Sequence, residues 1–177
     1  MSDRPHAPSV PGWLARPVRH LYVHVPFCAS KCSYCAFYSE ATRGELVDRY
    51  VGALLRELEL VAEELAPETI FFGGGTPTVL NCRQWERVLA AIRRLFPECP
   101  REWSVEANPA TLGLDKARLL LDYGVNRVSL GVQSLDADLL DRLGRVHTRE
   151  MAFRAYDTLR RAGFENVGLD LMFAIPG

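Results

Sequence analysis

The sequence lacks an excess of either charge and lacks any long apolar run. Its 177 residues include 21 Lys and Arg against 22 Asp and Glu, which leaves a formal net charge of −1. A nearly neutral chain has no general electrostatic attraction for nucleic acid or for an anionic membrane surface. No apolar stretch approaches the ~20 residues that span a bilayer. We therefore expect neither a nucleic-acid partner nor a membrane span.

Cysteine is scarce, and its five copies do not suit a disulfide framework. The number is odd and no secretory signal precedes them, so we expect reduced thiols in a cytoplasmic protein. A structural zinc site usually takes two separated pairs of ligands, and no second pair follows the first group of cysteines. Cys82 and Cys99 stand far from that group, and we interpret them as ordinary packed thiols.

Composition divides the chain into a short leading segment and one folded domain. Residues 1–19 contain Pro5, Pro8, Pro11 and Pro17 with few aliphatic side chains, which indicates a flexible, proline-rich N-terminal segment. The remainder, 20–177, suits a single globular domain, since 48% of the chain is hydrophobic.

Apolar periodicity predicts strands that alternate with amphipathic helices, which is typical of an α/β fold with a parallel sheet and right-handed crossovers. Thr42 and Glu45 form a candidate capping box for the first helix, which we expect to end before Pro67. Asn81 is the expected N-cap of the second helix. The expected strands are 21–25, 69–72, 102–106, 127–131 and 166–173, and the expected helices are 47–65, 83–95, 115–123, 137–143 and 150–162.

Polar and unusual residues follow these strands in succession. Because the C-terminal ends of parallel strands in a barrel meet at one rim, we expect the residues to meet there around a ligand. They are Cys28, Cys32 and Cys35 after the first strand, the glycines 73–75 after the second, Glu106 and Asn108 after the third, Gln133 after the fourth, and Asp170 on the fifth.

The spacing C-x3-C-x2-C of Cys28, Cys32 and Cys35 places three thiolates in eight residues. A cubane iron–sulfur cluster normally takes four cysteines, so three would leave one iron open to another ligand. Zinc or unliganded thiols remain the alternatives that the motif alone allows.

The other rim residues suit a ligand that combines an amino acid with a nucleoside. Gly73, Gly74 and Gly75 would let a ligand touch the main chain, although a plain turn into a helix is the alternative, and no P-loop Lys follows. Carboxylates such as Glu106 can accept from an amine or from ribose hydroxyls, and Arg145 can clamp a carboxylate.

The cysteine motif, with an aromatic residue before its last Cys, resembles the signature of the radical S-adenosylmethionine (SAM) family. The order of six segments is similar to that in oxygen-independent coproporphyrinogen III oxidases and their relatives, the radical-SAM haem chaperones. The resemblance runs from about residue 20 to the last residue, and the six segments are 22–28, 73–78, 106–109, 127–134, 144–147 and 170–177.

This resemblance implies a partial parallel (β/α) barrel whose radical-SAM core is residues 20–177. It implies a [4Fe–4S] cluster on Cys28, Cys32 and Cys35, and electron transfer that splits SAM into methionine and a 5′-deoxyadenosyl radical. The SAM pocket that it implies comprises Tyr22, Tyr34, Gly74, Gly75, Thr76, Glu106, Gln133, Arg145, Asp170 and Met172.

Two differences from the oxidases favour the haem-chaperone (HemW-like) branch. Phe37 stands where the oxidases carry an additional Cys, and they lack the run Gly144, Arg145, Val146 and His147. The resemblance then implies haem binding, a haem-acceptor protein and a reducing partner. The alternative is an oxidase that decarboxylates coproporphyrinogen III to protoporphyrinogen IX, and a third hypothesis is a metal-binding fragment without catalysis.

No residue is assigned a catalytic role, and the sequence does not identify a haem ligand. Histidine is a common axial ligand of haem, but we expect His24 to support the neighbouring site and His147 to fix Arg145. Relatives continue beyond this motif, so we expect about five strands of an incomplete barrel. An unpaired apolar edge at 169–173 would then favour self-association.

Overall fold

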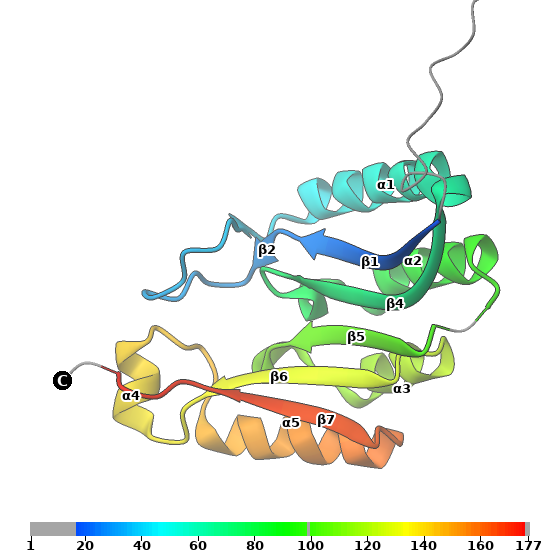
Figure 1. Cartoon of the computed structure of the whole chain (residues 1–177). Coiled ribbons are helices and arrows are strands. Elements are labelled where there is room, and N and C mark those ends of the chain that lie inside the picture. Colours follow the sequence, from blue (N-terminus) through cyan, green and yellow to red (C-terminus); the bar gives the residue numbers. More distant parts are fainter. Residues whose placement is uncertain (1–16, 99, 176–177) are drawn as a thin grey trace, which may run out of the picture.

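The structure is a computed structural model that describes residues 17–98 and 100–175. Five strands form one sheet in the order β1-β4-β5-β6-β7, and each neighbouring pair is parallel (Figure 1). The strands are β1 (Val18–Val25), β4 (Leu65–Gly74), β5 (Glu102–Ala107), β6 (Arg127–Gln133) and β7 (Asn166–Leu171). Two short strands, β2 (Phe27–Cys28) and β3 (Glu40–Ala41), pair in a second small sheet. The α/β fold class predicted from the sequence is therefore confirmed.

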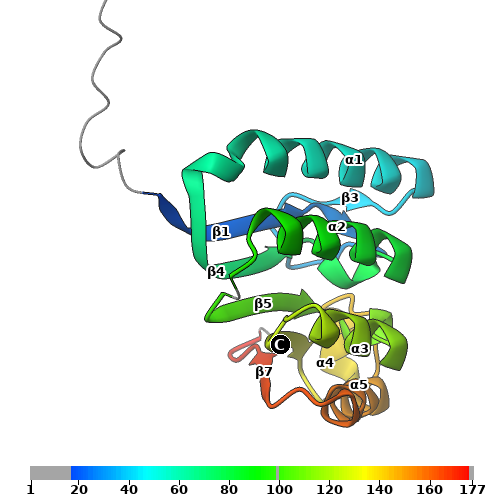
Figure 2. The same ribbon diagram turned by 90° about the vertical axis from the view of Figure 1, so that its right-hand side faces the viewer.

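The long helices lie on one side of the large sheet (Figure 2). Along this side α1 packs against α2, α2 against α3, and α3 against α5. The helices are α1 (Gly44–Val61), α2 (Cys82–Leu95), α3 (Leu114–Asp122), α4 (Ala137–Arg142) and α5 (Arg149–Ala162), and the 3-10 turns are η1 (Ala62–Glu64), η2 (Pro77–Val79) and η3 (Pro109–Thr111). No helix in the described part of the chain is long and apolar enough to cross a membrane.

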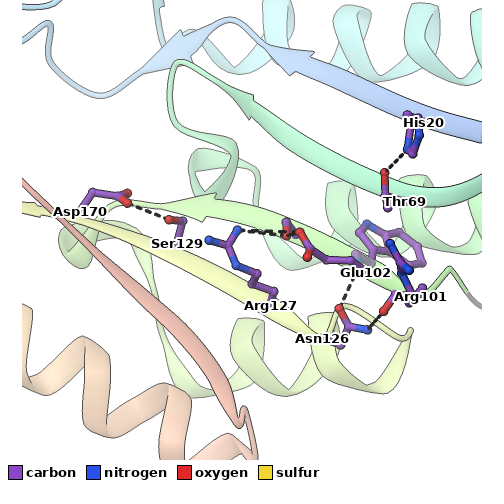
Figure 3. A network of polar contacts seen from close by, with 10 residues as sticks. His20, Thr69, Arg101, Glu102, Asn126, Arg127, Ser129 and Asp170 are labelled. Atoms are coloured by element: carbon purple, nitrogen blue, oxygen red, sulfur yellow. Dashed lines mark hydrogen bonds and ion pairs between the residues drawn. The ribbon is translucent and has the colours of Figure 1, made fainter.

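The strands alternate between an apolar face and a polar face. Val23, Phe72, Trp103 and Leu130 are among the side chains buried in the hydrophobic core. The opposite face carries polar residues, of which Figure 3 shows His20, Thr69, Glu102, Arg127, Ser129 and Asp170. Because side chains alternate along a strand, this polar face continues up to the rim where the candidate site lies.

The expected start of the first helix is wrong. Arg43 is the N-cap of α1 and makes no side-chain capping bond. Thr42 instead donates its backbone N–H to the Cys28 carbonyl at 3.2 Å, next to the β2–β3 pair. Tertiary pairing of the cysteine segment therefore overrides the local capping signal.

The expected end of the first helix at residue 65 is also wrong, because α1 ends at Val61 and both Leu65 and Pro67 lie within β4. The β1–β4 register shifts between Val18 and His20, which pair with Leu65 and Thr69. Pro67 falls in this irregularity, where a missing N–H costs no regular ladder bond.

The N-cap of α2 is confirmed. The Asn81 side chain accepts from the Gln84 N–H and the Gln84 side chain accepts from the Asn81 N–H, both at 2.9 Å. The neighbouring Cys82 is exposed in the first turn of α2, so its interpretation as a packed thiol is wrong. Cys99 lies outside the described residues.

β7 forms one edge of the large sheet and ends at Leu171, two residues before the predicted end. Leu169 and Leu171 are 51% and 63% exposed, and Phe173 beyond the strand is 93% exposed. An apolar edge is therefore present where the sequence predicted one, and self-association through it stays a prediction. The flexible segment predicted at 1–19 also stays a prediction, because 1–16 lie outside the described residues.

Candidate cofactor site

A cavity of about 410 Å³ lies at the C-terminal ends of the parallel strands. All three predicted cluster cysteines line it. All the predicted SAM-contacting residues line it as well, except Tyr22. The topology thus brings together residues that are up to about 140 positions apart, as the rim argument from parallel strands predicts.

The cysteine-bearing segment, residues 28–35, has little regular structure and is held by contacts to distant parts of the chain. Ser33 donates its N–H to the Leu143 carbonyl at 3.1 Å and its hydroxyl to the Arg142 carbonyl at 3.0 Å. Within the segment, the Cys35 N–H donates to the Cys32 carbonyl at 3.2 Å. The loop is therefore fixed against the end of α4.

The three thiols are partly exposed and form no disulfide. The Cys28 sulfur lies 3.6 Å from the Thr76 hydroxyl, and Arg145 Nη1 donates to Cys32 Sγ at 3.4 Å. No His and no fourth Cys among the described residues lines the cavity. Three soft sulfur donors without a fourth match the donor set of an iron–sulfur cluster that keeps one iron open.

The three thiols do not form a site for a single metal ion. Within residues 17–98 and 100–175, no group of three or more His, Cys, Asp or Glu side chains is arranged to hold a metal ion. In a cubane cluster each thiolate binds a different iron, so the three sulfurs need not converge on one point. The donor chemistry and the shared cavity fit a [4Fe–4S] cluster.

The glycines at the end of β4 make a close approach that only residues without a Cβ allow. A Cβ on Gly75 would lie 2.6 Å from the Phe27 carbonyl oxygen, and one on Gly74 would lie 2.6 Å from the His24 ring. Gly74 also has a φ of +109°, which favours glycine. The Gly75 and Thr76 N–H groups donate to the carbonyls of Val25 and Phe27 at 2.9 and 2.7 Å. These bonds fix the glycine loop beside the first cysteine.

Glu106 and Asp170 supply the carboxylates of the cavity. Burial raises the pKa of Glu106 above its ordinary value; the hydrogen bond from the Gly74 N–H, at 3.3 Å, opposes this rise and the Asp170 charge adds to it. Asp170 accepts from the Ser129 hydroxyl at 2.9 Å (Figure 3). Two neighbouring carboxylates, one of them desolvated, favour a positively charged group between them.

Gln133 and Arg145 come from the end of β6 and from the turn after α4. Gln133 has a φ of +66°, which is uncommon for a residue with a side chain. Arg145 Nη2 donates to the Gly131 carbonyl. A Cβ on Gly131 would lie 3.1 Å from Nε2 of the Gln133 side chain. The glycine therefore leaves room for both polar side chains above the strand.

Tyr22 is the predicted site residue that the structure leaves outside the cavity. It is 55% exposed, its hydroxyl lies 3.1 Å from His24 Nδ1, and its ring stacks on Phe71. Burial and the nearby charge of Glu106 raise its pKa, so it lies near the carboxylates without lining the same cavity.

Both histidines considered as haem ligands make contacts with neighbouring parts of the chain. His147 is only 2% exposed, and its Nε2 lies 3.0 Å from the Val132 carbonyl. The His24 ring packs where a Cβ of Gly74 would lie, and its Nδ1 bonds to Tyr22. His24 therefore lies against the glycine loop and His147 is bonded to the end of β6, and the expected role of His147 in fixing Arg145 stays a prediction.

The cavity also contains residues that the sequence reasoning did not select. Ser129 and Gly131 could have been found, because they occupy alternate positions of the strand that ends in Gln133. The residues of the cysteine loop carry no such periodic signal. The residues not selected are Ser30, Lys31, Phe37, Ser39, Ala107, Ser129 and Gly131, whereas Asn108, which the rim argument did select, also lines the cavity.

Comparison with protein families gives a match over most of the chain. The model described as "Radical SAM superfamily" matches residues 22–177. The "Heme chaperone HemW" of Bacillus subtilis (strain 168) is 41% identical over 165 residues, which cover 90% of this chain and 44% of that protein. The "Oxygen-independent coproporphyrinogen III oxidase" of Bradyrhizobium diazoefficiens is 38% identical over 162 residues, which cover 88% of this chain and 36% of that protein.

Among solved structures, the coproporphyrinogen III oxidase HemN from Escherichia coli superimposes with a TM-score of 0.82 at 32% identity. The match covers 91% of this chain and 38% of that chain. The present chain spans less than half the length of each of these relatives.

Proposed function

Because this chain belongs to the radical SAM superfamily, we propose that its cavity binds a [4Fe–4S] cluster and SAM, and that it serves in haem delivery as a haem chaperone. The cluster and SAM would supply one-electron chemistry. Cys28, Cys32 and Cys35 would hold the cluster, since they are the thiols that line the cavity.

The remaining polar groups suit the functional groups of SAM. Glu106, with its raised pKa, gains most from a cationic partner such as an α-ammonium group. Asp170 can accept from hydroxyls, and the N–H groups and open surface of the glycine loop allow close approach of a ligand to the main chain. Arg145 lines the cavity, and its buried Nε–H has no hydrogen-bond partner in the described part of the chain.

Phe37 is the observation that carries the choice of a chaperone over an oxidase. The residue lines the cavity and is 70% exposed, so an apolar ring stands at the cavity mouth where the oxidase pattern has a thiol. Tyr34, 40% exposed, lies on the same loop. A flat, largely apolar macrocycle gains by covering such rings, and the additional thiol of the oxidase pattern is absent at this position.

The relatives support the ligand class. The Bacillus subtilis relative is named a heme chaperone, and the relatives from Bradyrhizobium diazoefficiens and Escherichia coli are named coproporphyrinogen III oxidases. Both names refer to tetrapyrroles. We infer that this chain also acts on a tetrapyrrole, either haem or a porphyrinogen.

One anaerobic experiment separates the hypotheses. The chain is reconstituted with iron and sulfide, reduced, and incubated with SAM and coproporphyrinogen III, and a parallel sample is titrated with haem. We expect a haem spectral shift and no protoporphyrinogen. Formation of protoporphyrinogen would establish the oxidase, the second candidate that the HemN superposition favours. Binding of zinc alone, without iron or sulfide, would support the non-catalytic metal-binding fragment.

A further inference from the structure

The end of β6 departs from a regular strand at the point where it enters the cavity. Its register with β7 shifts between Gly131 and Gln133, and Gln133 takes up a φ of +66°. A left-handed conformation is unfavourable for a residue with a Cβ, so neighbouring groups have to hold it. The bulged end, residues 131–133, is therefore a place to look for positioning residues.

Three successive carbonyls of this bulged end each accept a hydrogen bond from elsewhere in the chain. The Gly131 carbonyl accepts from Arg145 Nη2, and the Gln133 carbonyl accepts from the Met172 N–H at 2.9 Å. The carbonyl of Val132, between them, lies 3.0 Å from His147 Nε2 and also accepts from the Ser134 N–H at 2.8 Å. Two of the outside donors come from one short segment, 145–147.

The His147 ring has a defined chemical state in this arrangement. A carbonyl oxygen can only accept, so Nε2 must carry the proton and Nδ1 is left without one. Nδ1 is buried and has no hydrogen-bond partner among residues 17–98 and 100–175. Burial, followed by the nearby charge of Arg145, lowers the pKa of His147 to about 4. The ring is therefore neutral at physiological pH and adds no charge beside Arg145.

The segment that carries His147 also reaches the cysteine loop. Arg145 Nη1 contacts Cys32 Sγ, and the Leu143 carbonyl accepts from the Ser33 N–H. Gly144, with a φ of +68°, lies against Ser33, where a Cβ would come within 3.3 Å of its nitrogen. Residues 142–147 thus connect the cysteine loop at one end with the bulged end of β6 at the other.

We propose that His147 is a positioning residue of the cavity: through its Nε2–H bond to the Val132 carbonyl, it holds Gln133 and Arg145 toward the ligand. His147 touches neither the cavity nor its ligand, since it is absent from the lining and almost fully buried. The part of this inference that concerns ligand affinity rests on the proposed binding of SAM.

Two substitutions distinguish the hydrogen bond from His147 to the Val132 carbonyl from simple packing of the side chain. His147→Gln can place an amide N–H close to the position of Nε2, whereas His147→Leu fills similar space without a donor. Leu159→Ala is the control, because it removes a fully buried side chain of α5, outside the 142–147 segment. The probe is S-adenosylhomocysteine, titrated calorimetrically into the anaerobically reconstituted chain.

We expect His147→Leu to weaken S-adenosylhomocysteine binding about fivefold or more, and His147→Gln to restore it to within about twofold. Leu159→Ala should lower the melting temperature without changing this affinity. The proposal is overturned if His147→Gln binds as weakly as His147→Leu, or if both bind like the unaltered chain.

Nuclear magnetic resonance separates this proposal from the proposed function. Long-range proton–nitrogen spectra of the unaltered chain should show His147 as the neutral Nε2–H tautomer at neutral pH. The Gln133 carbon shifts should report its left-handed conformation and lose that signature in His147→Leu. If the unaltered chain does not bind S-adenosylhomocysteine, the proposed function fails, and these spectra still decide the role of His147. A Nδ1–H tautomer or an unchanged Gln133 would overturn it.

Discussion

Arg145 and Cys32 are 113 residues apart in the chain, and a guanidinium nitrogen of Arg145 lies 3.4 Å from the Cys32 sulfur. The other terminal nitrogen donates to the Gly131 carbonyl on β6. The Arg145 side chain therefore links the cysteine loop to the sheet. A guanidinium can donate a charge-assisted hydrogen bond to a thiolate, which is the form of cysteine that binds metal.

Arg145→Met should therefore weaken both the fold around the rim and the retention of a cluster. Loss of hydrogen bonds from a partly buried charged group costs about 1.5–3 kcal/mol. The iron and sulfide content after gel filtration and the free energy of unfolding measure the two effects. Arg149→Met is the control, because Arg149 is exposed and lies over the Phe153 ring. Equal iron content in Arg145→Met and the unaltered chain would contradict the expected role.

Substitution of the cysteines separates the cluster ligands from the other described cysteine. Cys28→Ser, Cys32→Ser and Cys35→Ser should each abolish the iron and sulfide content of reconstituted protein, because each removes one of three thiolate ligands. Cys82→Ser should leave the content unchanged, since Cys82 is exposed on α2 and does not line the cavity. Loss of iron from Cys82→Ser would show that the ligand set is misassigned.

The sequence was sufficient to predict the site residues that end successive strands. Glu106, Gln133 and Asp170 could be placed at one rim because the order of strands and helices requires a parallel sheet, whose strand ends meet there. Asn81 could be placed because its capping partners lie within one helical turn. In these cases a local pattern and the global fold agree.

The features that the sequence did not predict depend on contacts between distant segments. The backbone N–H of Thr42 donates to the Cys28 carbonyl, so the capping pattern of Thr42 and Glu45 does not start the helix. The left-handed Gln133 and the buried ring of His147 exist because the segment after α4 reaches β6. Tyr22 is turned outward by stacking on Phe71. No pattern within one window of sequence contains this information.

Gly75→Ala should destabilise the fold and close part of the cavity. A Cβ there would lie 2.6 Å from the Phe27 carbonyl oxygen, and because the obstacle is backbone it cannot move aside cheaply. Overpacking of this kind costs about 1–3 kcal/mol, measured as the free energy of urea unfolding. Gly44→Ala is the matched control, since nothing lies within 4 Å of its Cβ position. Equal stability of the two variants would contradict the close approach.

Phe37→Ser tests the apolar mouth of the cavity. If the proposed haem binding covers this ring, its loss should weaken haem affinity about tenfold, because a phenylalanine side chain that becomes covered contributes about 1.5–3 kcal/mol. Titration of haem followed by absorbance measures the change. Phe153→Ser is the control, because Phe153 is 49% exposed on α5 and does not line the cavity. Unchanged haem affinity in Phe37→Ser would place the haem elsewhere.

His147 should make the stability of the fold depend on pH in the acidic range. Its pKa is lowered from 6.5 to about 4 in the folded chain, chiefly by burial. Between these two values the unfolded chain binds the proton and the folded chain does not, so the free energy of unfolding falls as the pH falls from 6.5 toward 4. This difference in pKa between the folded and unfolded chain corresponds to a loss of about 3 kcal/mol in the free energy of unfolding. Above pH 6.5 this contribution is complete and constant.

Glu106 acts in the opposite sense, since its pKa is raised on folding and its protonation favours the folded chain as the pH falls. The measurement therefore compares urea unfolding of the unaltered chain with that of His147→Gln at several pH values, because Glu106 contributes equally to both. The free energy of unfolding of the unaltered chain, relative to that of His147→Gln, should fall as the pH falls from 6.5 toward 4. Parallel stability curves would mean that the imidazole titrates alike in the folded and unfolded chain, and the buried, neutral ring would then be ruled out.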